Sequence, residues 1–550
     1  MKKRILLSLL TFLSVNSTFA IAPTLPEKEK ISIKWKTQWS ESIFKEAKKE
    51  NKLIILDLEA IWCHWCHVMH KETYSDPIVQ QLIESYFIPV RVDQDSRPDL
   101  ANRYRDYGWP ATIVFNPAGD EIIKRSGYIA SEDFKEELQK VINDPTPEEP
   151  ELDESKIHFS TKPFLSNELE KELENRVYSS YDQNLGGLKL PQKFLDGDSL
   201  EYCLIKAKSG NLITERMAKK TLDEAKVLID PIWGGAYQYS TMGGWNYPHF
   251  ERLATIQAKY LKIYAKAYSF WKDPLYLNNA KEIYRYLKSF LSNPDGVFYV
   301  SQDADVIQGK HSLEYFAKSN EERQKIGIPR VDKHIYSSQN GLIIEALVDF
   351  YNATGDKKYL DDAIHATEWI ARHRLLKPSI QDNLKWIFLD WTSLENIKIA
   401  IQWILKNKAW PERGFRHDEA DAAGPFLSDS LNMGRAFIIL YNATNEKKWL
   451  IRAEQVSRFI DRHFTSPIAG FVTSEASCKV CAVRSPSRLI DENIEIVRFA
   501  NRLFQKTHNF AYKEIAEHAM KYLVTPEIAT KTLTEPGILI ADMELQYLRN

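Results

Sequence analysis

The sequence predicts two folded units of different class, an α/β domain near the N-terminus and a larger all-α domain that follows it. Strand and helix patterns alternate over residues 31–143, whereas helical patterns follow one another over residues 166–550. The segment between them, 144–165, opens with a run rich in prolines and acidic residues, which is typical of a linker. Net charge is −2, so composition gives no indication of nucleic-acid binding.

Short apolar runs bounded by charged or turn residues define the strands of the α/β domain. Runs that predict strands lie at 52–57, 87–92, 111–115 and 121–124. Helical patterns lie at 39–50, 64–85 and 131–143. The last two strands flank Asn-Pro-Ala-Gly-Asp, a sequence suited to a hairpin turn. The predicted order is therefore β-α-β, then a β-hairpin and a final helix.

A C-x-x-C pair, Cys63 and Cys66, follows the first predicted strand and opens the next helix. This context predicts a thioredoxin-like redox site, because the positive end of a helix dipole favours a thiolate at Cys63. We expect Cys63 to attack a disulfide and Cys66 to resolve the mixed disulfide. Asp57 is expected to relay a proton, and Pro110 to be a cis-proline that shapes the peptide-binding face.

Two other interpretations of this motif stay open. The histidines of C-H-W-C-H, together with His70, are possible metal ligands, although a zinc site normally needs four converging ligands. A purely structural disulfide is the second. The strand before the motif and the Trp-Pro before the third strand favour the redox site, so we expect no metal and no cofactor.

An internal repeat organises the all-α domain. The segments D-P-L-Y-L from residue 273, D-K-K-Y-L from 356 and E-K-K-W-L from 446 match one another, and each opens the second helix of a predicted hairpin. Loops with glycine and an aromatic residue recur between the hairpins. About twelve to fourteen helices fit this length, as six hairpins would need. The predicted fold class is an α/β thioredoxin-like domain followed by an all-α (α/α)6 toroid.

Several segments resemble the spermatogenesis-associated protein 20 family. They are C-H-W-C-H-V-M from residue 63, Y-S-D-P from 74, V-D-Q-D-S-R-P-D from 92, Y-P-H-F-E from 247 and S-Q-N-G from 338. The resemblance covers nearly all of the chain beyond its first 20 residues. It implies a thioredoxin-like domain fused to a toroid like those of six-hairpin glycosidases, and it leaves substrate and reaction undefined. The chain departs from the family pattern at His70, where an acid is usual.

Polar residues in the predicted rim loops form a candidate toroid cleft: His249, Glu251, Asp303, Asp305 and Asp421. Glycoside hydrolysis needs two carboxylates across one cleft, and epimerases on similar toroids use acid–base histidines. The alternative is that these residues cap helices and fasten loops. We favour this alternative because no pair has diagnostic spacing.

A second C-x-x-C pair, Cys478 and Cys481, follows one of the glycine-aromatic loops. Three interpretations compete: a local disulfide, an internal redox partner for Cys63 and Cys66, and half of a four-thiolate zinc site. The local disulfide is the expectation we favour.

Residues 1–20 have the pattern of a signal peptide, with basic residues at the start, an apolar run of about 11 residues and Ala20 or Ala22 as the cleavage position. We therefore expect a periplasmic or secreted protein without stable membrane insertion. The predicted function is an exported thiol–disulfide oxidoreductase whose partners are protein thiols or disulfides. The alternatives are a carbohydrate-active or carbohydrate-binding toroid with a structural thioredoxin domain, and a non-catalytic interaction scaffold.

Overall fold

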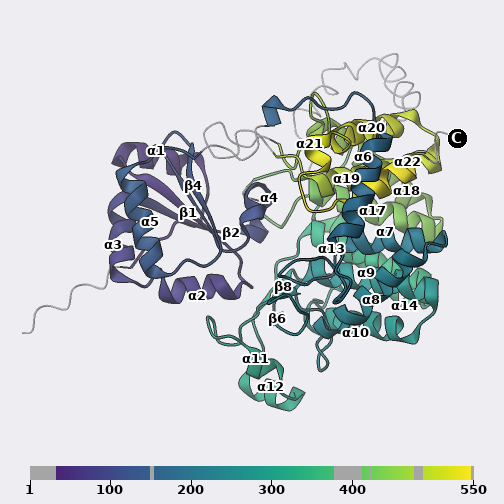
Figure 1. The fold of residues 1–550 in the computed structure, drawn as a ribbon, viewed down its shortest axis with the longest axis horizontal. Coiled ribbons are helices and arrows are strands. Elements are labelled where there is room, and N and C mark those ends of the chain that lie inside the picture. The colour runs from purple at the N-terminus through teal and green to yellow at the C-terminus, as the bar shows by residue number, and fades with distance from the viewer. Residues whose placement is uncertain (1–31, 149–153, 377–411, 422, 476–486, 547–550) are drawn as a thin grey trace, which may run out of the picture.

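The computed structural model describes residues 32–148, 154–376, 412–421, 423–475 and 487–546 (Figure 1). Within these ranges, no helix has the length and apolar character needed to cross a membrane. The sequence-predicted pair Cys478 and Cys481 lies outside the described residues, as does the predicted signal peptide.

The N-terminal domain contains a four-stranded sheet in the order β2-β1-β3-β4. Its strands are β1 (Leu53–Glu59), β2 (Phe87–Asp93), β3 (Ala111–Phe115) and β4 (Glu121–Ser126). Strands β1 and β2 are parallel, whereas β3 is antiparallel to both β1 and β4. Residues Ile54 and Ile55 of β1 enter different apolar clusters, so helices cover both faces of the sheet.

The helices of this domain are α1 (Glu41–Glu50), α2 (His64–Glu72), α3 (Pro77–Tyr86), α4 (Pro98–Tyr104) and α5 (Ser131–Asn143), with 3-10 turns η1 (Gln94–Ser96) and η2 (Arg105–Tyr107). The sequence pattern predicts a single helix over 64–85, but the structure has two. The break is physical: Asp76 accepts hydrogen bonds from the amides of Ile78 and Val79, and Pro77 takes the first helical position. Helix α4 and the two turns were not predicted.

Among the described residues, six inner helices of the second domain form a closed ring. They are α7 (Gly197–Lys208), α9 (Ala254–Trp271), α13 (Ser337–Thr354), α17 (Leu427–Thr444), α19 (Ile490–Thr507) and α22 (Pro536–Gln546). Each packs against the next, and α22 packs against α7, which closes the ring. The outer helices are α8 (Leu212–Ala225), α10 (Pro274–Phe290), α14 (Lys357–His373), α18 (Lys447–Phe464), α20 (Phe510–Leu523) and α6 (Asn167–Ser180). The predicted (α/α)6 toroid is confirmed.

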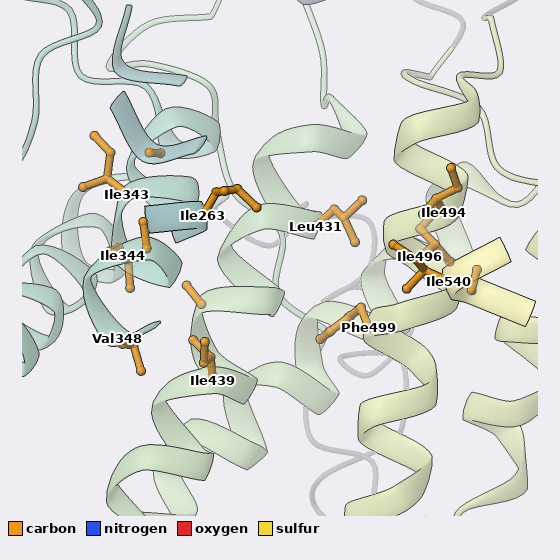
Figure 2. Close-up of a cluster of buried hydrophobic side chains, with 14 of the residues drawn as sticks. Ile263, Ile343, Ile344, Val348, Leu431, Ile439, Ile494, Ile496, Phe499 and Ile540 are labelled. Carbon is orange, nitrogen blue, oxygen red and sulfur yellow. The ribbon is translucent and has the colours of Figure 1, made fainter. Parts of the chain in front are cut away.

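Apolar side chains of the inner helices belong to one buried cluster, part of which Figure 2 shows. Ile344 of α13, Leu431 of α17 and Phe499 of α19 belong to this cluster. Gly341 of α13 allows a close approach, since a Cβ there would lie 2.7 Å from the Asn432 carbonyl carbon of α17.

The predicted repeat coincides with the starts of the outer helices. Asp273, Asp356 and Glu446 are the N-cap residues of α10, α14 and α18, and the first two accept a hydrogen bond from a helix amide. The repeat therefore marks equivalent corners of three hairpins.

Short strands in the toroid rim were missed because two-residue strands carry no detectable period. They are β5 (Tyr239–Ser240), β6 (Pro248–His249), β7 (Arg252–Leu253), β8 (Ser301–Gln302) and β9 (Val331–Asp332). The remaining elements are η3 (Glu154–Lys156), η4 (Lys226–Leu228), α11 (Leu313–Phe316), α12 (Asn320–Ile326) and α21 (Pro526–Ala529). The sheet β7-β8-β9 reaches the N-terminal domain, where the Ala304 amide donates to the Trp62 carbonyl at 3.3 Å.

Candidate functional site

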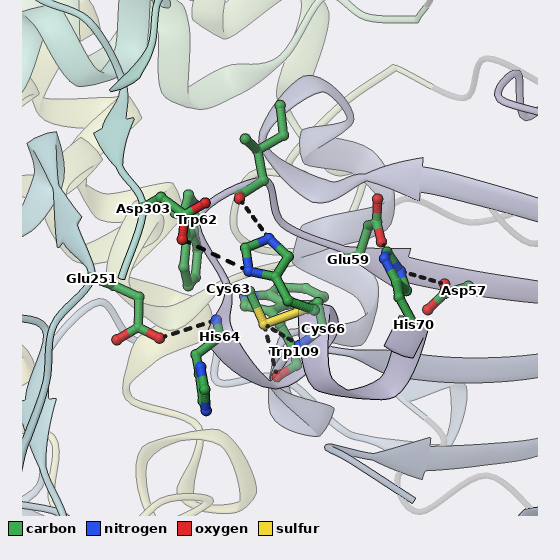
Figure 3. Close-up of a disulfide and its surroundings, with 12 residues drawn as sticks. Asp57, Glu59, Trp62, Cys63, His64, Cys66, His70, Trp109, Glu251 and Asp303 are labelled. Carbon is green, nitrogen blue, oxygen red and sulfur yellow. Dashed lines mark hydrogen bonds and ion pairs between the residues drawn. A yellow bond between two sulfur atoms is a disulfide. The ribbon is translucent and has the colours of Figure 1, made fainter. Parts of the chain in front are cut away.

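Cys63 and Cys66 form a disulfide at the start of α2, with their Cα atoms 5.3 Å apart (Figure 3). Cys63 is the N-cap residue, and its sulfur accepts a hydrogen bond from the Cys66 amide at 3.1 Å. The Trp109 carbonyl oxygen lies 3.5 Å from Cys63 Sγ, and the Trp109–Pro110 peptide is cis. Strand β1 and the loop before β3 thus place the disulfide, a helix N-terminus and the cis-proline together.

Asp57 lies on β1 among charged groups. Its carboxylate accepts a hydrogen bond from Arg91 Nε at 2.8 Å, and His70 Nε2 lies 3.6 Å away. Burial raises the pKa of Asp57, but Arg91 and His70 more than offset this and hold it below its ordinary value. Among the described residues, no hydrogen bond or ion pair joins Asp57 to either cysteine. The predicted proton relay therefore stays a prediction.

The face of α2 that carries the disulfide lies against the toroid rim (Figure 3). His64 Nδ1 lies 2.8 Å from Asp305 Oδ1, and His67 Nδ1 lies 3.2 Å from Asp305 Oδ2. The His64 amide donates to Glu251 Oε1 at 3.4 Å. The structure thus brings three of the predicted cleft residues (Glu251, Asp303 and Asp305) to the C-x-x-C helix rather than to an open cleft.

Burial and charge shift the pKa values at this contact. Burial lowers the pKa of His67, but the hydrogen bond to Asp305 and the charge of Asp303 raise it above its ordinary value. Burial raises the pKa of Asp303 to about 7. Burial also raises the pKa of Asp305, but hydrogen bonds from His64 and His67 hold it below its ordinary value. The neighbouring carboxylates Asp303 and Asp305 are therefore shifted in opposite directions.

Of the other predicted cleft residues, His249 lies beside Glu251, with His249 Nδ1 3.9 Å from Glu251 Oε2, whereas Asp421 lies in a separate loop. His249 stacks on Tyr239 with ring centroids 4.4 Å apart. Asp421 accepts hydrogen bonds from the amides of His417 and Asp418 at 2.9 and 2.7 Å, so it fastens a turn. No hydrogen bond or ion pair of the described residues joins Asp421 to Asp303 or Asp305.

A polar cavity of about 350 Å³ lies where the N-terminal domain covers one end of the toroid. Its lining from the N-terminal domain comes from η1, α4 and η2, and its lining from the toroid includes Gln339, His417 and Arg435. His417 Nε2 donates to the Asp95 carbonyl at 2.7 Å, which joins the two domains. His417 was not predicted as a site residue, although it lies in the same loop as Asp421.

Comparisons with known proteins agree with this architecture. The family model Thioredox_DsbH, described as "Protein of unknown function, DUF255", matches residues 18–144. Spermatogenesis-associated protein 20 of Mus musculus is 27% identical over 302 residues, which are 48% of this chain and 38% of that protein. The resemblance to this family is confirmed. An uncharacterized protein of Caenorhabditis elegans is 24% identical over 77% of this chain and 62% of its own length. The chain thus spans less than two thirds of these relatives.

Thiol:disulfide interchange protein DsbD 1 of Pseudomonas aeruginosa is 38% identical over 80 residues, which are 14% of this chain and 13% of that protein. Among solved structures, D-mannose isomerase aligns with a TM-score of 0.48 at 12% identity, over 70% of this chain and 98% of the other. Cellobiose 2-epimerase from Bacillus thermoamylovorans aligns with a TM-score of 0.46 at 10% identity, over 65% and 87%.

Proposed function

We propose that this protein is a thiol–disulfide oxidoreductase that acts through Cys63 and Cys66. The observation that carries the proposal is the placement of the Cys63–Cys66 disulfide at the N-terminus of α2, beside the cis-Pro110 peptide. A disulfide interchange protein is similar to part of the chain, which supports the same chemistry.

In the reduced form, the Cys63 thiolate attacks one sulfur of a substrate disulfide and expels the other as a thiolate. The Cys66 thiolate then attacks Cys63 Sγ and releases the second substrate thiolate. Two electrons pass to the substrate, and the Cys63–Cys66 disulfide forms. The reverse sequence oxidises a substrate dithiol.

The toroid limits access to this site. Cys63 and Cys66 are 3% and 1% exposed, and Leu253 of β7 packs against them. A protein-sized substrate therefore requires the toroid rim to move away from α2, whereas a small dithiol needs a smaller opening.

Cys63→Ser is expected to abolish exchange, because serine cannot form a mixed disulfide. The measurement is dithiol-dependent reduction of insulin, together with reduction of a small aromatic disulfide. Cys203→Ser is the matched control, since Cys203 is a buried free thiol in α7, and it should keep wild-type rates within about twofold. Full activity in Cys63→Ser would refute the proposed function.

We further propose that the chain is exported and works in an oxidising compartment. The N-terminal pattern of residues 1–20 supports export, and disulfides persist outside the cytoplasm. Cleavage would leave a chain that begins at Ile21 or Pro23. The intact mass of the protein purified from each cell fraction tests this expectation.

A second proposed function is binding of a small carbohydrate in the cavity between the domains. The observation that favours it is the side-chain oxygen Oε1 of Gln339, which is buried without a partner among the described residues, on a residue that lines the cavity. Such an oxygen is a free acceptor for a sugar hydroxyl. Monosaccharides are expected to raise the melting temperature of the wild type but not of Gln339→Leu. An equal shift in both proteins would contradict this site.

A further inference from the structure

A cluster of two histidines and three carboxylates lies between α2 and the toroid rim, and Figure 3 labels three of its members, His64, Glu251 and Asp303. We call it the junction cluster, and its members are His64, His67, Glu251, Asp303 and Asp305. His64 and His67 are three residues apart on α2, so they share one face of the helix. Asp303 and Asp305 follow β8 in the rim.

Distances in the junction cluster suit coordination of one ion. One ligand atom each from His67, Asp303 and Asp305 lies within 4.8 Å of the other two. His67 Nδ1 is 3.2 Å from Asp305 Oδ2 and 3.8 Å from Asp303 Oδ1. Ligands about 2.0–2.2 Å from a tetrahedral zinc ion lie about 3–4 Å from one another. Small adjustments of side chains are therefore enough to bind an ion.

The orientation of His67 requires a proton or a metal ion between its Nδ1 atom and the carboxylates. Its Nε2 atom lies 3.2 Å from the Ile61 carbonyl oxygen, so Nε2 carries a proton and donates it. In a neutral ring, Nδ1 then carries a lone pair, and this lone pair faces the oxygens of Asp303 and Asp305. Either a second proton or a metal ion has to lie between them. Donation of the second ring N–H to a backbone carbonyl is the usual arrangement of metal-bound histidine.

Within the described residues, the carboxylates of the junction cluster pair with histidines only, and His249 Nδ1 lies 3.9 Å from Glu251 Oε2. Asp303 Oδ2 and Glu251 Oε2 are buried without a hydrogen-bond partner among the described residues, on side chains whose residues are 2% and 3% exposed. No lysine or arginine in the described ranges forms an ion pair with Glu251, Asp303 or Asp305. Buried acids without such partners are costly, and a divalent cation would relieve this cost.

A second group, made of His70 of the same helix and two acids of β1, shows the contrasting case. Asp57, Glu59 and His70 also have ligand atoms within 4.8 Å of one another. There, however, Arg91 Nε lies 2.8 Å from Asp57 and 3.4 Å from Glu59, so a guanidinium already supplies the cation. Figure 3 shows this group on the side of α2 away from Glu251 and Asp303. His70 is therefore a matched control for His67.

We propose that His67, Asp303 and Asp305 bind a divalent first-row transition-metal ion, with His64 and Glu251 as neighbouring donors. Imidazole and carboxylate ligands suit zinc, manganese and iron(II). The ion would join α2 of one domain to the rim of the other beside the Cys63–Cys66 disulfide. The disulfide sulfurs take no part in this site, and the proposal is independent of the redox function.

The test uses the oxidised full-length protein after treatment with a chelator, titrated with Co²⁺ by calorimetry and absorption spectroscopy. We expect one Co²⁺ per chain, a rise in melting temperature, and a visible spectrum without a thiolate-to-cobalt charge-transfer band. Such a band would indicate that Co²⁺ binds to cysteines, including Cys478 and Cys481. If all of the bound Co²⁺ shows this band, the proposal is overturned.

Asp303→Asn keeps the shape of the side chain and its Oδ1 acceptor, to which the Asp305 amide donates. We expect it to fold, to weaken Co²⁺ binding at least tenfold, and to lose the metal-dependent rise in melting temperature. His67→Asn should behave in the same way, whereas His70→Asn should bind Co²⁺ like the wild type. Binding that is undiminished in Asp303→Asn, or no stoichiometric binding in the wild type, leaves a protonated His67 as the cation and overturns the proposal.

Discussion

Replacing Asp230 with asparagine is expected to lower the free energy of unfolding by about 3–5 kcal/mol. Asp230 accepts hydrogen bonds from Arg252 of β7 and Arg323 of α12, and all three residues are fully buried. One carboxylate thus lies between two guanidinium groups. An uncharged amide leaves both charges without an anion in a water-free environment, which is the costly way to break a buried ion pair.

Burial raises the pKa of Asp230, but the charge of Arg252 and the hydrogen bond from Arg323 hold it below its ordinary value. A carboxyl whose pKa is lowered in the folded state contributes stability above the pH at which the unfolded chain titrates. This contribution is lost as pH falls, so the effect of Asp230→Asn should shrink in acid.

Urea denaturation of variant and wild type at neutral pH gives the measurement. Glu282→Gln is the control, because Glu282 pairs with Arg285 on the surface, with side chains 43% and 44% exposed. Glu282→Gln should change the free energy of unfolding by no more than about 0.5 kcal/mol. A change of less than about 1 kcal/mol in Asp230→Asn would show that the buried network contributes little.

Raising the pH from about 6.5 to 9 is expected to destabilise the folded protein through His417, by an amount on the order of 3 kcal/mol. Burial lowers the pKa of His417, but Asp429 and the Asp95 carbonyl raise it to about 9. A histidine whose pKa is raised in the folded state stabilises it fully below the pKa of the unfolded chain. The stabilisation is lost as pH rises through the pKa of the folded state.

His417→Asn is expected to reduce this slope without removing it, since the pKa of His70 is also raised to about 9. Burial lowers the pKa of His70 too, but Asp57 and Glu59 outweigh that effect. The urea midpoint, measured from pH 6 to 10, should therefore depend less on pH in each single variant than in the wild type. The dependence should be weakest in the double variant His417→Asn/His70→Asn. An unchanged slope in the double variant excludes these histidines as the cause.

Local patterns in the sequence predicted local structure well. The run at 111–115 is β3, and the pattern at 131–143 is α5, because a short apolar run and a 3.6-residue spacing are properties of consecutive residues. The break between α2 and α3 was also present in the sequence, as an Asp-Pro capping signal inside the predicted helix.

The environment of the candidate site was not predictable from such patterns. Glu251 and Asp305 lie 187 and 241 residues from His64, and rim strands of two residues bring them there. The residue types indicated only that the rim is polar. Only the docking of the two domains decides that these acids face histidines of the C-x-x-C helix, rather than one another across a sugar cleft.

The domain that closes the cavity also holds the disulfide against the rim. Residues from η1, α4 and η2 line the cavity, and α2 of the same domain presents Cys63 to Leu253. A molecule that binds only the docked arrangement therefore lowers the fraction of molecules with an open disulfide. Linkage is reciprocal, so a mixed disulfide that holds the domains apart weakens binding in the cavity by the same factor. For such a molecule, occupancy of the cavity and the reactivity of the thiol pair would change in opposite directions.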